Sequence, residues 1–264
     1  MDLQLQDKVA LVTGSTAGIG YAIASRLAGE GAHVYVNGRT QQRVDEAIAS
    51  IRREIPSAKI DGLALDLSKA EAAGEATRRI PKLDILVNNL GIFEPKPFEG
   101  IPDEDWLRLI ETNFLSGVRL CRFWLPKMKQ AGWGRILFIS SESAVSIPAE
   151  MIHYGVTKTM QVALARGLAE TTAGTAVTIN SILAGPTRSE GVGTFVQQLA
   201  SAQGIDQDQV EREFFEKMRP GSLLRRFESP DEIANMAAFL ASPLSSGTNG
   251  AAIRVEGGIL RSAF

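Results

Sequence analysis

Cysteine and histidine are scarce in this chain of 264 residues, which contains one cysteine, Cys121, and two histidines. A single cysteine cannot form a disulfide within the chain, as is typical of proteins in a reducing compartment. Two histidines and one cysteine also offer no cluster of zinc-type ligands, so we predict that the protein has no metal site. Its chemistry must therefore depend on other side chains.

Long apolar runs and blocks of like charge are also missing. No stretch is apolar over the roughly 18 residues that a transmembrane helix needs, and the first residues lack the basic and then apolar pattern of a signal peptide. Lysine and arginine number 28 against 30 for aspartate and glutamate. This near-balance gives no electrostatic reason to expect a nucleic acid or an anionic membrane as a partner. We expect a cytoplasmic protein.

Short apolar segments alternate with amphipathic helical segments along the whole chain. This alternation is typical of βαβ units in a parallel sheet. The length suits one domain and no linker or repeat is present, so we predict a single α/β domain over residues 1–264 with a doubly wound, Rossmann-like parallel sheet. The expected strands are 9–12, 34–36, 62–65, 85–87, 135–139, 177–179 and 252–255.

Residues 186–220 carry no strand pattern. A structureless loop of that length is uncommon in a compact domain, so this segment should contain helices of its own. Val210, Phe214 and Met218 are spaced at i, i+4 and i+8, with Phe215 beside them, which predicts one apolar helix face. That face packs as core, forms a lid over the substrate, or does both, and the sequence leaves these readings open. As a lid, it would favour a hydrophobic substrate.

A glycine-rich segment follows the first expected strand and opens the next helix. Gly14, Gly18 and Gly20 let the backbone turn tightly and approach a pyrophosphate group, and they direct backbone amides toward it. Because the segment joins a buried strand to a helix, it predicts nucleotide binding rather than an ordinary turn.

Tyr154 and Lys158 lie four residues apart, so on a helix they share one face. A free tyrosine has a pKa near ~10 and exchanges protons poorly at neutral pH. An ammonium group alongside favours the phenolate and moves the pKa toward the range in which general acid–base catalysis is efficient. Ser141 lies thirteen residues before Tyr154, at the end of an expected strand.

Together these motifs resemble the short-chain dehydrogenase/reductase family, from about Lys8 to Gly258. The three residues between Tyr154 and Lys158 resemble its carbonyl reductase and alcohol dehydrogenase branch. The resembling pieces are Thr13-Gly14-x3-Gly18-Ile19-Gly20, Asp66-Leu67, Asn88-Asn89-Leu90-Gly91, Asn113, Ser141, Tyr154-x3-Lys158, Asn180-x3-Ala184-Gly185, 229–234 and Val255-Glu256-Gly257-Gly258.

The resemblance implies a role for each reacting residue. Tyr154 would be the general acid for carbonyl reduction and the base for alcohol oxidation. Lys158 would lower the pKa of Tyr154 and bind the nicotinamide ribose, Ser141 would stabilise the substrate oxygen, and Asn113 would hold a water connecting Lys158 to solvent. His153 adjoins Tyr154, but consecutive helix positions point about 100° apart, so we give it no catalytic role and place it at the pocket rim. The resemblance places pocket-lining positions at Phe93, Glu94, Glu142, Ser143, Met151 and Phe195.

Cofactor choice depends on the end of the second expected strand. An NAD enzyme normally has a carboxylate there, but Gly38 holds that position and Arg39 follows it. A guanidinium group matches a phosphate bidentately, so NADP(H) is favoured over NAD(H). A merely solvated Arg39 would leave NAD(H) as the alternative. The other contacts that the resemblance implies are Gly14, Ser15, Gly18, Ile19, Gly20, Asp66, Leu67, Asn89, Gly91, Tyr154, Lys158, Thr187 and Ser189.

We therefore expect an NADP(H)-dependent oxidoreductase that transfers a hydride between the cofactor and a small-molecule carbonyl or secondary alcohol, similar to 3-oxoacyl reductases. The alternatives are an NAD-dependent alcohol dehydrogenase and a nucleotide-binding sensor or scaffold without activity. The resemblance also implies a homo-oligomer, expected to be a tetramer, with the helices around 114–128 and 156–168 packed between subunits.

Overall fold

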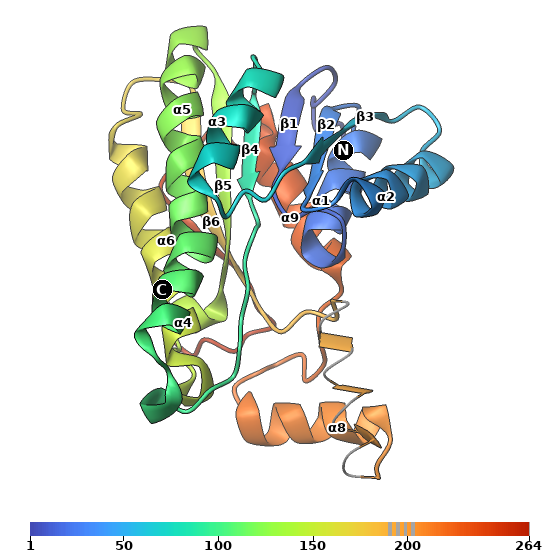
Figure 1. Ribbon diagram of the computed structural model, residues 1–264, viewed down its shortest axis with the longest axis vertical. Helices are drawn as coiled ribbons and strands as arrows, with labels where there is room; N and C mark the ends of the chain where they lie inside the picture. The colour runs from blue at the N-terminus through green and yellow to red at the C-terminus, as the bar shows by residue number, and fades with distance from the viewer. Residues whose placement is uncertain (190–191, 194–195, 198–199, 202–203, 264) are drawn as a thin grey trace.

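The computed structural model describes residues 1–189, 192–193, 196–197, 200–201 and 204–263. Its strands form one parallel seven-stranded sheet in the order β3-β2-β1-β4-β5-β6-β7 (Figure 1). All the expected strands are present, and helices cover both faces, so the predicted doubly wound α/β fold is confirmed. The strands are β1 Val9–Val12, β2 His33–Gly38, β3 Lys59–Ala64, β4 Ile85–Asn88, β5 Gly134–Ser141, β6 Val177–Ala184 and β7 Ala252–Val255.

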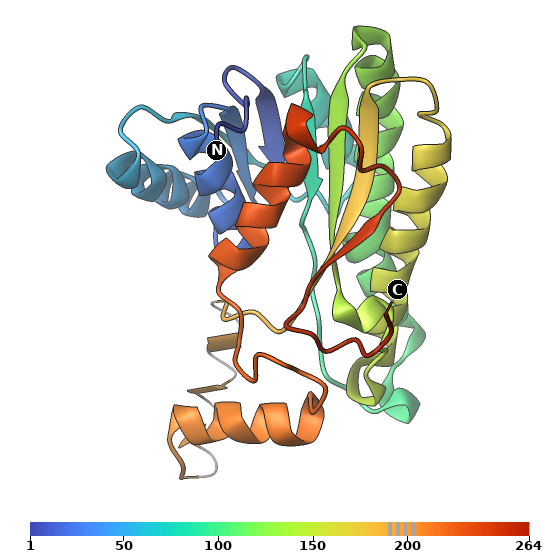
Figure 2. The ribbon, with the colours of Figure 1, turned by 180° about the vertical axis from the view of Figure 1, so that it is seen from behind.

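Helices α1, α2 and α9 cover one face of the sheet, and α3, α5 and α6 cover the other (Figure 1, Figure 2). A separate apolar cluster fills the space between each group and the strands. Every residue of β5 and β6 is buried, including polar residues such as Arg135 and Asn180, as expected of central strands that are covered on both faces. The helices are α1 Gly18–Gly29, α2 Gln41–Glu54, α3 Ala70–Arg79, α4 Asp103–Leu109, α5 Ser116–Ala131, α6 Ile152–Glu170, α8 Gln207–Glu213 and α9 Pro230–Ala241.

The strand order reverses between β1 and β4, which are neighbours in the sheet although β2 and β3 lie between them in sequence. In open α/β sheets, ligands bind in the crevice at the carboxyl ends of the strands beside such a reversal. The turn after β1 and the segment after β4 both lie at that edge. The fold therefore places the glycine-rich segment where a nucleotide would bind.

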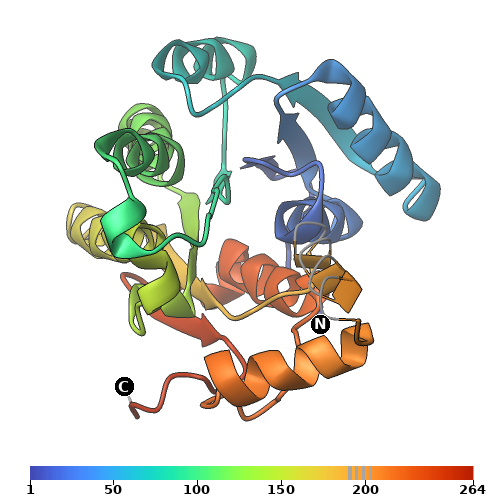
Figure 3. The same ribbon diagram turned by 60° about the horizontal axis from the view of Figure 1, so that its bottom comes forward.

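Helix α8 lies beyond this same edge of the sheet (Figure 1, Figure 3). It begins at Asp206, whose carboxylate accepts a hydrogen bond of 2.6 Å from the amide of Gln209. It continues into a π-helix over Phe214–Met218. A π-helix takes an extra residue per turn, so the buried positions are Val210 and Phe215, and Met218 is 45% exposed. Phe214 still packs on the buried side, with 5.2 Å between its ring centroid and that of Phe227, so the predicted i, i+4, i+8 stripe is wrong only at Met218.

The buried side of this segment has its own small core. Phe215 packs with Phe227, at 5.2 Å between ring centroids, and with Val210. Val196 and Ala200 complete the cluster. Among the described residues, the apolar face of this segment therefore packs as core. Phe195, a predicted pocket-lining residue, lies outside the residues that the structure describes.

The described residues contain neither a membrane-spanning helix nor a group of metal ligands. None of their helices combines the length and the hydropathy that a membrane span requires. No group of three or more histidine, cysteine, aspartate or glutamate side chains is arranged to hold a metal ion.

Candidate active site

The sequence-predicted reacting residues come from three elements that meet at the carboxyl edge of the sheet. Ser141 ends β5, Tyr154 and Lys158 lie in the first turns of α6, and Asn113 lies in η2, a π-helix over Ile110–Leu115. Gly91 lies beside them, because a Cβ atom there would be 3.5 Å from Lys158 Nζ. The structure therefore brings these residues together at one place.

The two serines at the end of β5 have different environments. Successive residues of a strand point to opposite faces. The Ser140 hydroxyl donates a 2.9 Å hydrogen bond to the backbone carbonyl of Lys158, which holds α6 against the strand. Ser141 Oγ accepts a 3.1 Å hydrogen bond from the amide of Ser143 and donates to the carboxylate of Glu142. Ser141 also acts on the Tyr154 phenol, since its hydroxyl group favours the charged form of the phenol and tends to lower its pKa.

The pKa of Tyr154 departs from its usual value in the direction opposite to the sequence-based expectation. Burial raises the pKa of the phenol, and the negative charge of Glu142 raises it further. The hydroxyl group of Ser141 and the charge of Arg219 oppose this rise but do not cancel it. The expected lowering by Lys158 is therefore not produced by the protein groups in this arrangement, because burial of the phenol dominates.

Lys158 is itself deeply buried. Its Nζ donates a 2.8 Å hydrogen bond to the carbonyl of Ile139, and it lies 5.6 Å from the centroid of the Tyr154 ring. Burial lowers the pKa of the amino group to about 8. Strongly shifted pKa values in a crevice are typical of functional groups.

Asn113 connects three segments of the site. Its Oδ1 accepts a 2.8 Å hydrogen bond from the amide of Ile92, and its Nδ2 donates to the carbonyl of Ile92 and to Thr157 Oγ1. Its own carbonyl accepts a hydrogen bond from the Gln161 side chain, at 2.5 Å. A π-helix shifts the backbone hydrogen bonds by one residue and is frequent at functional sites. Asn113 thus fixes the segment after β4 against α6.

The glycine turn, residues 13–20, has the geometry of a nucleotide cradle. Gly14 and Gly18 adopt φ angles of +60° and +57°, which residues with a Cβ atom rarely adopt. A Cβ atom at Gly20 would lie 2.5 Å from Asn89 Nδ2, so no larger residue fits. Gly20 and Ile19 begin α1, which directs backbone amides toward the crevice. These residues therefore fit an anionic pyrophosphate group.

Polar side chains brace this turn from below. Asn89 Nδ2 donates to the carbonyls of Thr13 and Gly14, at 2.9 and 3.0 Å. Asn37 Oδ1 accepts from the amide of Gly14 at 3.0 Å, a contact that our sequence reasoning missed. Ser15 is completely buried and donates to the carbonyl of Val12, so its hydroxyl supports the turn from beneath.

A pocket lies at the ends of β2 and β3, and we call it the adenosine pocket because the sequence predicts that the adenosine half of the cofactor binds there. Arg39 and Asp66 both line it. Asp66 Oδ1 accepts hydrogen bonds from the amide and the hydroxyl of Ser68, so this carboxylate stabilises the turn after β3. Arg39 is exposed and has no ion-pair partner among the residues described. The pocket is lined by Gly14, Thr16, Ala17, Asn37, Gly38, Arg39, Leu65, Asp66, Leu67 and Leu90.

The segment after β6 runs back toward the glycine turn. Thr187 Oγ1 donates a 2.9 Å hydrogen bond to the carbonyl of Gly185. A Cβ atom at Gly18 would lie 3.2 Å from the Cβ of Ser189, so Ser189 lies directly over the turn. The predicted cofactor positions in the two halves of the chain therefore border one crevice.

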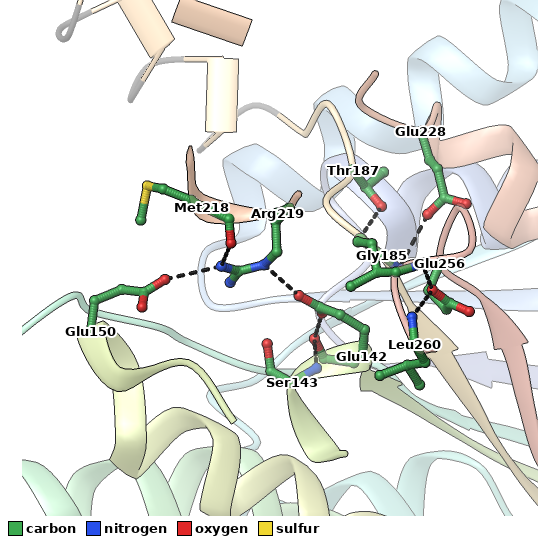
Figure 4. A network of polar contacts seen from close by, with 12 residues as sticks. Glu142, Ser143, Glu150, Gly185, Thr187, Met218, Arg219, Glu228, Glu256 and Leu260 are labelled. Atoms are coloured by element: carbon green, nitrogen blue, oxygen red, sulfur yellow. Dashed lines mark hydrogen bonds and ion pairs between the residues drawn. The ribbon is translucent and has the colours of Figure 1, made fainter. Parts of the chain in front are cut away.

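Two residues near the site differ from the sequence-based expectations. Arg219, which no motif pointed to, forms ion pairs with Glu142 and Glu150 (Figure 4). His153 is fully buried and packs edge-on against Trp106 at 5.9 Å, so its expected position at the pocket rim is wrong. Phe93 does lie against Tyr154, with 6.2 Å between ring centroids.

A doubly wound sheet with a glycine turn beside a Ser–Tyr–Lys site defines an NAD(P)-dependent oxidoreductase. The chain matches the family model described as short chain dehydrogenase over residues 8–200. It therefore belongs to the short-chain dehydrogenase/reductase family, as its motifs predicted.

Its similarity to individual proteins extends over the whole chain. It is 47% identical over 264 residues to "Uncharacterized oxidoreductase YvaG" of Bacillus subtilis, with 100% of each chain covered. It is 32% identical over 263 residues to the 3-oxoacyl-(acyl-carrier-protein) reductase FabG of Aquifex aeolicus, with 98% of this chain and 100% of the relative covered. Among solved structures, L-sorbose reductase from Gluconobacter frateurii, complexed with NADPH and L-sorbose, matches with a TM-score of 0.93 and 30% identity, covering 99% of this chain and 100% of that one.

Proposed function

We propose that this protein reduces a carbonyl group, or oxidises a secondary alcohol, with NADP(H), and that Ser141, Tyr154, Lys158 and Asn113 carry the reaction. The observation that supports the proposal most strongly is the arrangement of the three residues: Ser141 ends β5, Tyr154 lies at the start of α6, and the buried Lys158 Nζ lies 5.6 Å from the centroid of the Tyr154 ring. A scaffold without activity does not need a buried lysine beside a tyrosine at a nucleotide crevice.

In this mechanism the substrate carbonyl oxygen accepts hydrogen bonds from Ser141 and Tyr154. Tyr154 donates its proton to that oxygen as the carbonyl carbon becomes an alcohol carbon, and it accepts the proton in the reverse direction. Because the pKa of Tyr154 is raised, the phenol is protonated at neutral pH, which suits reduction. Bound NADPH supplies the hydride. Lys158 and Asn113 position the helix that carries the phenol.

We propose NADP(H) rather than NAD(H) because Arg39 lines the adenosine pocket and Gly38 leaves no carboxylate there. The 2′-phosphate of NADP(H) would bind the guanidinium group, and a carboxylate would repel it. That L-sorbose reductase, a similar structure, was solved with NADPH supports this preference.

Several finer properties belong to the same proposal. A 3-oxoacyl compound is one candidate substrate, supported by the similarity to the reductase FabG. We also propose a single domain whose segment 186–220 is a lid, a cytoplasmic location, and a homotetramer with α5 and α6 between subunits. Light scattering over a range of concentrations tests the assembly, and a monomer throughout would contradict it.

The test of the function is NADPH oxidation by the wild type and by Tyr154→Phe over a panel of ketones, aldehydes and 3-oxoacyl thioesters. We expect the variant to lose about 100-fold or more in turnover while it still binds NADPH, because it lacks the proton that the alkoxide needs. Tyr35→Phe, which changes a tyrosine on β2, is the matched control and should keep its turnover. Wild-type turnover in Tyr154→Phe would show that the mechanism is wrong.

A further inference from the structure

A chain of polar contacts leads from the reacting serine to the lid segment. Ser141 donates to the carboxylate of Glu142, and Glu142 Oε1 accepts a 3.0 Å hydrogen bond from Arg219 Nε. Arg219 Nη1 in turn donates to Glu150 at 3.1 Å and to the carbonyl of Met218 at 2.9 Å. Figure 4 shows Arg219 between the two carboxylates. We call the central pair the Glu142–Arg219 bridge.

The bridge is buried and directly adjoins Ser141, one of the proposed reacting residues. The side chains of Glu142 and Arg219 are only 5% and 11% exposed. A buried carboxylate is costly unless hydrogen-bond donors satisfy its oxygens. In Glu142 each oxygen has one donor, Arg219 for Oε1 and Ser141 for Oε2. The carboxylate is therefore satisfied only while the Ser141 hydroxyl is turned toward it.

Catalysis changes this arrangement. A serine hydroxyl has one hydrogen to donate, and Ser141 Oγ already accepts from the amide of Ser143. When Ser141 donates its hydrogen to the substrate carbonyl, Glu142 Oε2 loses its donor. A buried acceptor that loses its partner costs about 1–3 kcal/mol, and more when it is charged. A hydroxyl group of the substrate can replace the lost donor.

We propose that Glu142 selects a substrate with a hydroxyl group on the carbon next to the carbonyl, which is a neutral hydroxy ketone of the kind found in ketoses. This rests on the proposed function, since it assumes that the substrate oxygen binds between Ser141 and Tyr154. The substrate hydroxyl donates to Glu142 Oε2, which lies one hydrogen bond from Ser141. A plain ketone leaves that oxygen without a donor.

The surrounding charges favour a neutral substrate. Glu142, Glu150 and Arg219 together carry two negative charges and one positive charge, so a substrate carboxylate near the bridge is repelled. Among the described residues of the lid segment, Val210 and Phe215 are buried in its own small core and are not available to bind an acyl chain. Both features favour hydroxylated over acyl substrates.

The experiment compares hydroxyacetone with butanone, which differ only by a hydroxyl in place of a methyl group, with NADPH as reductant. We expect the wild type to prefer hydroxyacetone by about 100-fold in kcat/KM, the effect of one unpaired buried acceptor. The ratio should fall to within about 5-fold in Glu142→Leu, which has no acceptor. Glu213→Gln removes a carboxylate paired with Lys217 on the lid surface and should leave the ratio unchanged.

Other results would contradict either the inference or the proposed function. Equal rates for the two ketones in the wild type, or better reduction of acetoacetate or an acetoacetyl thioester, overturn this inference and leave the proposed function standing. If no carbonyl compound is reduced, ketohexoses included, the proposed function fails and the inference with it. If Glu142→Leu does not fold, Glu142→Gln decides, because its amide oxygen can accept from Arg219 while its NH2 group, a donor, takes the place of Oε2. An unchanged ratio there contradicts the role of Glu142. Calorimetric binding of hydroxyacetone to Tyr154→Phe, weakened by Glu142→Gln, gives a readout independent of turnover.

Discussion

The amino group of Lys158 lies 5.6 Å from the ring centroid of Tyr154, and its 2.8 Å hydrogen bond goes to the carbonyl of Ile139. The lysine is therefore held by the strand that ends at the reacting serine. Burial at this place lowers its pKa to about 8, so the charged form is destabilised by folding. A lysine buried in this way lowers the free energy of unfolding, which is expected where a functional group is kept at a cost in stability.

Replacing this lysine should change how stability depends on pH. The folded pKa of about 8 lies below the unfolded value of roughly 10.4, so the cost of burying the charge is present below pH 8 and is relieved as the pH rises toward 10.5. Lys158→Met removes that cost. We expect its free energy of unfolding, relative to the wild type, to be about 2–3 kcal/mol more favourable at pH 7 than at pH 10.5. Urea denaturation at both pH values measures this, with the exposed Lys127→Met as control. A difference independent of pH would contradict it.

Arg39 should decide between the two cofactors. Arg39→Ala removes the guanidinium group from the adenosine pocket, so the KM for NADPH should rise about 10-fold or more while the KM for NADH changes less than about 2-fold. Steady-state kinetics with both cofactors measure the two values. Arg43→Ala, which changes an arginine in the first turn of α2, is the control for loss of a positive charge near the site. An equal rise in KM for both cofactors in Arg39→Ala would show that Arg39 does not select NADP(H).

Asn113 should matter for stability as well as turnover. Asn113→Ala leaves the amide and the carbonyl of Ile92 without their partners, so we expect a loss of about 2–4 kcal/mol in the free energy of unfolding. Thr157→Val removes one acceptor of the Asn113 amide and one donor to the carbonyl of Tyr154, but it keeps both bonds to Ile92, and it should lose about 1 kcal/mol. Chemical denaturation of both variants gives the comparison. If the two variants lost the same amount, Asn113 would not be the residue that joins these segments.

Glu228 should make the protein less stable at alkaline pH. It is 4% exposed and accepts a 3.1 Å hydrogen bond from the amide of Gly185. Burial, followed by the charge of Glu232, raises its pKa to about 7. Because the folded pKa lies above the unfolded value, this stabilising contribution is present below about pH 4.5 and is lost as the pH rises through 7.

A neutral replacement tests this effect. Glu228→Gln should be more stable than the wild type by about 1–3 kcal/mol at pH 8, and the gain should disappear near pH 5. Thermal or urea unfolding across this pH range measures it, with the exposed Glu46→Gln as control. A gain that stays constant from pH 5 to pH 8 would show that ionisation of Glu228 is not the cause.

The strands could be predicted because the signal is local. Val9–Val12 and the other strands are short segments flanked by turn residues, and the central strands β1, β4, β5 and β6 are almost completely buried. The i, i+4 spacing of Tyr154 and Lys158 likewise fixes one helix face before any tertiary contact forms. The π-helices at Ile110–Leu115 and Phe214–Met218 escaped prediction because side-chain periodicity assumes a regular α-helix.

The sequence by itself determined the parallel α/β fold, the glycine turn and the spacing of Ser141 and Tyr154, since each depends on residues close together in the chain. Only the tertiary structure decided the partners of Glu142. Arg219 lies 77 residues further along and reaches it only when the lid segment folds against the carboxyl edge of the sheet. The raised pKa of Tyr154 likewise depends on burial and on charges from distant segments, which arise only when the chain is packed.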